Sequence, residues 1–166
     1  IMPENWACTN EDRVFIGPSA HLFGFNITIL YTTPMWKGIL GSCPDHSPLD
    51  CTNGVFLGLE TDDEIILSKK DLSTFDFKNF SVHNFMFRYC FGQIKKCPKG
   101  LNPIYRCINN YIVGPETDLK DLNVTNWNFD NISLSDSKIN GLYGRVATCP
   151  RNNYGYKCID NYIVGM

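Results

Sequence analysis

The chain has 166 residues, a formal net charge of −2 and a sequence pI of about 5.9. Its Lys and Arg residues form no basic block, so the surface offers no electrostatic basis for binding nucleic acid. No apolar segment approaches the ~18 residues of a membrane-spanning helix, so we expect membrane attachment only through a segment outside this chain. Aromatic residues make up 13% of the chain and alanine is rare, which predicts an all-β fold.

Three copies of one motif fill almost the whole chain. Each copy has a Cys-Pro pair followed by a cysteine that begins an octet. The octets are Cys51-Thr-Asn-Gly-Val-Phe-Leu-Gly58, Cys107-Ile-Asn-Asn-Tyr-Ile-Val-Gly114 and Cys158-Ile-Asp-Asn-Tyr-Ile-Val-Gly165. A period of about 53 residues decides the architecture, and predicts one domain (1–166) with internal repeats 1–58, 59–114 and 115–166.

Each repeat is predicted to contain four short strands. The first is an apolar run, the second alternates around an Asn, the third precedes the Cys-Pro pair and the fourth is the octet. The first three strands are predicted at 14–16, 25–29 and 37–40, at 65–67, 77–82 and 91–94, and at 122–124, 129–134 and 142–147. Four strands in three copies predict a β-trefoil with pseudo-threefold symmetry, in which closure removes free sheet edges. A β-prism and a fragment of a β-solenoid, cut from a longer array, are the alternatives.

The eight cysteines indicate either disulfides or metal sites. The two cysteines of each motif enclose seven to nine residues, which does not fit the Cys-x2–4-Cys spacing of zinc sites, so no metal is predicted. Pairing within each repeat leaves two cysteines, which we pair by exclusion. The predicted disulfides are Cys43–Cys51, Cys97–Cys107, Cys149–Cys158 and Cys8–Cys90. This framework favours an oxidising location, either secreted or on the extracellular surface.

Four Asn-x-Ser/Thr sequons support the same location. The predicted glycosylation sites are Asn26, Asn79, Asn123 and Asn131. Three of them fall in the second predicted strand of a repeat, so glycans would surround one girdle of a barrel. The alternative is purely structural, because an alternating strand places Asn outward whether or not a sugar is attached.

The motifs of catalysis and cofactor binding do not occur. We find no Gly-x-Ser-x-Gly, no His-Glu-x-x-His and no phosphate-binding glycine loop. A polar cluster between Cys43 and Cys51 includes His46, but neighbours on a short loop rarely converge on one reacting atom, so we expect a solvated hairpin tip. The chain is therefore predicted not to be an enzyme and to need no cofactor.

Aromatic side chains are the remaining candidates for binding. Phe85, Phe87, Tyr89 and Phe91 alternate and would share one face of a strand. That face would be the inside of a barrel, or, if turned outward, a binding patch. The candidate ligand-binding residues are Phe85, Phe87, Tyr89, Trp36, Tyr105 and Tyr156.

A rigid scaffold whose repeats differ mainly in their loops favours a non-catalytic binding module for an extracellular protein partner. Recognition of a host receptor by a virus or parasite would suit the composition. The candidate contact segments are 17–24, 31–38, 83–92 and 135–142. The alternative is a carbohydrate-binding lectin, with sites at Tyr105/Asn110 and Tyr156/Asn161. A third interpretation is a protease inhibitor that presents a disulfide-braced loop.

Overall fold

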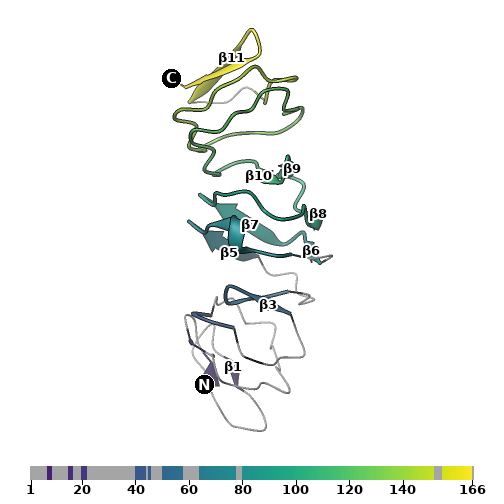
Figure 1. Ribbon diagram of the computed structural model, residues 1–166, viewed down its shortest axis with the longest axis vertical. Coiled ribbons are helices and arrows are strands. Elements are labelled where there is room, and N and C mark those ends of the chain that lie inside the picture. Colours follow the sequence, from purple (N-terminus) through teal and green to yellow (C-terminus); the bar gives the residue numbers. More distant parts are fainter. Residues whose placement is uncertain are drawn as a thin grey trace. The chain divides into compact units, whose positions relative to one another are not determined.

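The computed structural model describes residues 7–8, 15–16, 20–21, 40–43, 45, 50–57, 64–77, 80–151 and 155–165 (Figure 1). The chain divides into two compact units, Ile1–Ile65 and Ile66–Met166. The prediction of an all-β fold is confirmed, because the regular elements among the described residues are short strands and one 3-10 turn, η1 (Leu72–Thr74). No helix among them has the length and hydropathy needed to cross a membrane.

The strands are two to four residues long and pair in two-stranded sheets. In the first unit they are β1 (Ala7–Cys8), β2 (Phe15–Ile16), β3 (Cys51–Thr52) and β4 (Val55–Phe56). The later strands are β5 (Ile65–Ser68), β6 (Ser81–Val82), β7 (Phe85–Arg88), β8 (Lys99–Leu101), β9 (Arg106–Ile108), β10 (Tyr111–Val113), β11 (Tyr156–Ile159) and β12 (Tyr162–Gly165). Sheets β1–β2, β3–β4, β9–β10 and β11–β12 are antiparallel, whereas β6 pairs with β8 in parallel.

Each octet forms a tight hairpin, and the prediction of a single strand there was wrong. The two residues between the paired strands both have positive φ, as a type I′ turn requires. Their φ values are 46° and 78° at Asn53 and Gly54, 47° and 64° at Asn109 and Asn110, and 48° and 64° at Asp160 and Asn161. Asn, Asp and Gly tolerate this left-handed conformation best, so the turn chemistry splits each octet into two strands.

Between the last two hairpins the chain follows a period of five residues. We call these five-residue units pentads; they cover 118–122, 123–127, 128–132, 133–137 and 138–142. In each pentad the N–H of the fifth residue donates to the carbonyl of the second, as in Trp127 to Val124 at 3.0 Å. The fourth residue has positive φ, which places it at the third position of a type II turn. These fourth residues are Asp121, Asn126, Asn131, Asp136 and Gly141.

The pentads also explain which side chains form the core. The second and fifth residues point inward, whereas the first, third and fourth face solvent or stay half-exposed. The buried residues at these inward positions are Leu119, Val124, Trp127, Phe129, Ile132 and Leu134. First residues such as Asn123 and Asn128 accept a hydrogen bond from the backbone N–H two residues later, at 3.0 and 2.9 Å. These Asx turns fix the start of each pentad.

The chain winds in successive turns of about 20 residues, which we call coils. Parallel bridges between residues 20 positions apart join one coil to the next. The bridged pairs are Asp71–Phe91, Asp118–Lys138, Asn123–Tyr143 and Asn128–Thr148. Twenty residues are four pentads, so the chain completes one turn before it pairs with itself. Parallel pairing at a constant offset is typical of a solenoid, whereas a trefoil is assembled from antiparallel hairpins. The β-trefoil is therefore not confirmed. In the described part of the second unit, these bridges and the β6–β8 pair are parallel, whereas β9–β10 and β11–β12 are antiparallel hairpins.

The pentads account for the fate of the other predicted strands. Strands were correctly predicted at 65–67 and around Phe15–Ile16. The segment 122–124 instead contains an isolated bridge at Asn123, and 129–134 contains a turn. The segments 91–94 and 142–147 contain isolated bridges and bends. The segment 25–29 and residues 37–39 lie outside the described residues.

Candidate functional site

Three disulfides brace the hairpins, one in each repeat. They join Cys43 to Cys51, Cys97 to Cys107 and Cys149 to Cys158, as the repeat predicted. The residue three positions before the first cysteine donates its N–H to a carbonyl in the hairpin turn. These bonds run from Leu40 to Gly54, Ile94 to Asn110 and Val146 to Asn161, at 2.9, 2.8 and 2.8 Å. The hairpin is thus held by a covalent bond and a backbone bond at the same place in every repeat.

The bridge predicted between Cys8 and Cys90 is not formed. Cys90 is a free, buried thiol, and it donates to the carbonyl of Leu67 at 3.3 Å. Burial raises the pKa of this thiol from 9.0 to about 11, so Cys90 is an inert core residue at neutral pH. The side chain of Cys8 lies outside the described residues.

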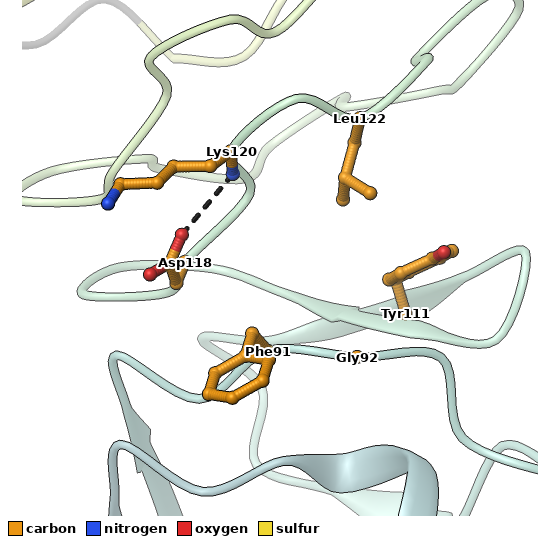
Figure 2. Close-up of a pocket in the computed structure, with 6 residues that line it drawn as sticks. All are labelled: Phe91, Gly92, Tyr111, Asp118, Lys120 and Leu122. Atoms are coloured by element: carbon orange, nitrogen blue, oxygen red, sulfur yellow. Dashed lines mark hydrogen bonds between the residues drawn. The ribbon is translucent and has the colours of Figure 1, made fainter.

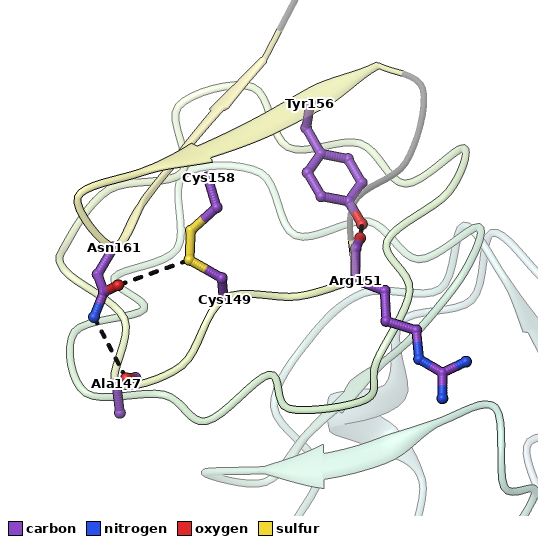
Figure 3. The surroundings of a disulfide bond; sticks show 6 residues. All are labelled: Ala147, Cys149, Arg151, Tyr156, Cys158 and Asn161. Atoms are coloured by element: carbon purple, nitrogen blue, oxygen red, sulfur yellow. Dashed lines mark hydrogen bonds between the residues drawn. A yellow bond between two sulfur atoms is a disulfide. The ribbon is translucent and has the colours of Figure 1, made fainter.

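Tyr105 and Tyr156 are buried, so neither presents its ring to a ligand. The hydroxyl oxygen of Tyr105 accepts the N–H of Phe87 at 3.1 Å, and that of Tyr156 accepts the N–H of Leu134 at 3.2 Å. The Tyr156 hydroxyl also donates to the carbonyl of Arg151, beside the Cys149–Cys158 bond (Figure 3). The prediction of an exposed binding role was wrong because both rings supply acceptors to buried backbone groups.

The alternating aromatic residues of the second repeat do not share one face. Phe85 and Phe87 alternate along β7 and are both buried in the core, so neither is available as an exposed ligand-binding residue. Strand β7 ends at Arg88, and Tyr89 has a φ of 52°, which turns the chain at a corner. Tyr89 is half-buried with Lys138 Nζ 5.1 Å from its ring centre, and Phe91 emerges on the surface. Trp36 lies outside the described residues.

Two of the four sequons can be placed. Asn123 and Asn131 are exposed, but Asn131 has a φ of 61° and lies in a turn, not in the strand predicted for it. The Nδ2 of Asn131 donates to Asp130 Oδ2 at 3.0 Å. The side-chain oxygen of Asn123 accepts the Thr125 hydroxyl at 2.6 Å. Asn26 and Asn79 lie outside the described residues, as does His46.

The candidate site is a groove of about 380 Å³ in the second unit. It is lined by Phe91, Gly92, Tyr111, Asp118, Lys120 and Leu122. Figure 2 shows Leu122 facing the Phe91–Gly92 segment across the groove, with Asp118 and Lys120 at one end and Tyr111 at the other. Phe91 is 45% exposed, so much of its ring is open to solvent at the groove.

Two features of the backbone shape the groove. Gly92 has a φ of 91°, and a Cβ there would lie 2.4 Å from Asp71 Oδ1, so only glycine fits without displacing that carboxylate. Opposite it, Asp118 Oδ1 accepts the Lys120 N–H at 3.3 Å and its Oδ2 lies 3.5 Å from Lys138 Nζ. The groove therefore has an apolar floor with one charge of each sign at its rim.

The groove combines apolar and aromatic side chains with one carboxylate and one ammonium group. Apolar and aromatic walls with a few polar groups are typical of recognition sites. The described residues contain no cluster of three or more His, Cys, Asp or Glu side chains that could hold a metal ion.

No protein-family model, curated protein or solved structure matches this chain.

Sequence reasoning found only part of the groove. Phe91 lies within the predicted contact segment 83–92, whereas Tyr111 and Leu122 were predicted only as parts of the strands 107–114 and 122–124. The missed signal was the five-residue pattern of 118–142, which places Asp118, Lys120 and Leu122 on a single pentad.

Proposed function

We propose that this chain is a non-catalytic binding domain that works in an oxidising, extracellular setting and binds a protein partner through the groove at Phe91. The observation that carries this proposal is the exposure of Phe91 beside Tyr111 and Leu122, with Asp118 and Lys120 at the rim. An aromatic anchor on a rigid coil, surrounded by polar groups, has the anatomy of an interface hot spot.

The rigidity of the scaffold supports this function. Phe91 forms a parallel β-bridge with Asp71 in the preceding coil. The carbonyl of the neighbouring residue, Cys90, accepts the N–H of Asp118 at 3.1 Å. Both sides of the groove are therefore fixed by backbone bonds. A preorganised surface spends little of its binding free energy on ordering side chains and loops.

Three disulfides support an oxidising compartment, because such bonds persist in secreted and surface proteins and are rare in the cytosol. In that setting Asn123 and Asn131, both exposed, are the described candidates for glycosylation. Glycans there would lie on the coil 118–137 and not on the residues that line the groove.

The two alternative functions have weaker support. A lectin with one sugar site per repeat would need outward aromatic rings, but Tyr105 and Tyr156 are buried. An inhibitor loop would need to protrude freely. The loop of the second repeat instead forms β8, which pairs with β6, and the Ser81 hydroxyl donates to the Gly100 carbonyl at 3.2 Å.

The proposal is tested by a binding screen with two matched variants. The probes are a panel of secreted and cell-surface proteins and, in parallel, a glycan array. Phe91→Ala should weaken binding to any protein hit at least tenfold, since hot-spot truncations cost about 2 kcal/mol or more. Tyr143→Ala is the control, because Tyr143 occupies the equivalent position of a later coil, is 58% exposed and lies outside the groove.

Two results would reject the proposal. One is a set of ligands that are all glycans. The other is a protein ligand whose affinity is unchanged by Phe91→Ala.

A further inference from the structure

Two hairpins of nearly identical sequence have different surroundings. The octets at 107–114 and 158–165 differ only at Asn109 and Asp160. In β9–β10, Val113 is fully buried and Ile108 and Tyr111 are half-buried against the core. The equivalent residues of β11–β12 are Ile159, Tyr162 and Val164, which are 56%, 50% and 46% exposed. The same apolar face is thus covered in one repeat and open to solvent in the next.

The cover of the first hairpin is the coil 117–137. Trp127 lies over Tyr111 with their ring centres 5.5 Å apart, and Val113 packs in one cluster with Leu119 and Val124. Polar bonds complete the contact. The carbonyl of Gly114 accepts the hydroxyls of Thr117 at 2.7 Å and Ser137 at 2.8 Å.

The second hairpin is packed on one face only. Tyr156 and Ile163 are buried with the core cluster, whereas Tyr162 and Val164 point away from it. Ile159, Tyr162 and Val164 lie close together on this two-stranded hairpin, whose strands are only four residues long, and they form an apolar patch. Such patches mark interaction sites.

We propose that the outer face of the β11–β12 hairpin is a docking surface for one further coil of the same repeat, entered directly from β12 and equivalent to residues 115–137. The occupant is defined by the precedent within this chain. It carries an aromatic residue at the place of Trp127 to stack on Tyr162, aliphatic residues to cover Val164, and hydroxyls to donate to the Gly165 carbonyl.

Docking of that coil would also build a second groove. Tyr143-Gly144 and Phe91-Gly92 both lie six residues before a Cys-Pro pair, and the two glycines have φ values of 102° and 91°. Tyr162 is the equivalent of Tyr111. The wall formed by Phe91, Gly92 and Tyr111 therefore has an equivalent in Tyr143, Gly144 and Tyr162. In the first groove the opposite wall consists of Asp118, Lys120 and Leu122. In the second groove that wall would come from the docked coil.

The test is a lengthened chain in which a second copy of residues 115–166 follows Gly165. We expect one unfolding transition with a midpoint at least about 5 °C higher than that of the original chain. We also expect the amide of Val164 to exchange with solvent at least tenfold more slowly. Tyr162→Ser should remove most of this gain in the lengthened chain and shift the original chain by less than about 1 °C, because the ring is half-exposed there.

Asp160→Asn is the matched control, since it makes the turn identical to that of β9–β10 and leaves the apolar face intact. It should preserve the gain in the lengthened chain. The proposal is overturned if the added copy melts separately or stays unfolded, or if Tyr162→Ser has no effect on the gain. It is also overturned if the original chain forms dimers that Tyr162→Ser dissociates, because a second copy would then be the occupant.

Discussion

Replacing Tyr105 by Phe tests the role of the buried hydroxyls directly. Tyr105 is 4% exposed, and its hydroxyl oxygen accepts the N–H of Phe87, which is itself buried. The substitution keeps the ring and leaves this N–H without its acceptor. A buried donor without a partner costs about 1–3 kcal/mol. For a chain of 166 residues, each kcal/mol lowers the melting midpoint by about 2–4 °C.

The assay is thermal unfolding, combined with amide hydrogen exchange at Phe87. We expect a clear drop in midpoint and faster exchange of that amide, because its hydrogen bond is lost. Tyr143→Phe removes a hydroxyl from a side chain that is 58% exposed and should change stability by less than about 0.5 kcal/mol. If Tyr105→Phe is as stable as Tyr143→Phe, the hydroxyl does not satisfy the backbone and the reasoning fails.

Three further changes follow from the coil and its core. Burial raises the pKa of the Cys90 thiol from 9.0 to about 11, so the contribution of this thiol to stability is intact below pH 9 and is lost as the pH rises to 11. In denaturant titrations, the free energy of unfolding should therefore fall by roughly 3 kcal/mol more over that range than it does for Cys90→Ala. Equal pH dependence in the two proteins would contradict the burial of the thiol. Gly92→Ala should be less stable than Gly155→Ala by about 1 kcal/mol in urea unfolding. Both glycines have positive φ, but only a Cβ at residue 92 would lie against the Asp71 side chain, which accepts the Ser73 N–H. Equal losses of stability would show that the turn at Asp71 is dispensable. Phe129→Ala should lower the free energy of unfolding by about 3–5 kcal/mol, since its ring is fully buried in the coil, and a loss below 1 kcal/mol would mean that the pentads do not enclose a core.

The sequence predicted the covalent framework better than the path of the chain. The three motif disulfides follow from the repeat alone, because two cysteines recur at the same offset from each octet. The fourth pair rested on exclusion, which assumes that every cysteine is bonded. Cys90 shows the flaw in that assumption, since a free cysteine packs like any small apolar residue at an inward position.

The trefoil was predicted because repeats of about 53 residues were read as the structural unit. The period that determines the backbone is much shorter. In 118–142 the second residue of each pentad is apolar, and the fourth residue of each pentad is Asn, Asp or Gly. This pattern was visible in the sequence, but a search for alternation and for long repeats does not detect a period of five.

The groove was harder to predict than the fold. Its two walls come from segments about 27 residues apart, Phe91-Gly92 and 118–122, which meet only because successive coils stack. Whether Phe91 faces inward depends on the corner at Tyr89, where a non-glycine residue has positive φ. Sequence periodicity carries no sign of such a corner, so the alternating aromatic residues were placed on one face.

The most direct test of the coil is a measurement of scalar couplings across backbone hydrogen bonds by NMR. We expect the amide nitrogen of Tyr143 to couple to the carbonyl carbon of Leu122, and that of Val124 to couple to the carbonyl carbon of Tyr143. This pair of couplings defines a parallel bridge at an offset of 20 residues. In an antiparallel hairpin, the number of the bonded partner falls as the residue number rises. Couplings that follow this antiparallel pattern would contradict the stacked coil.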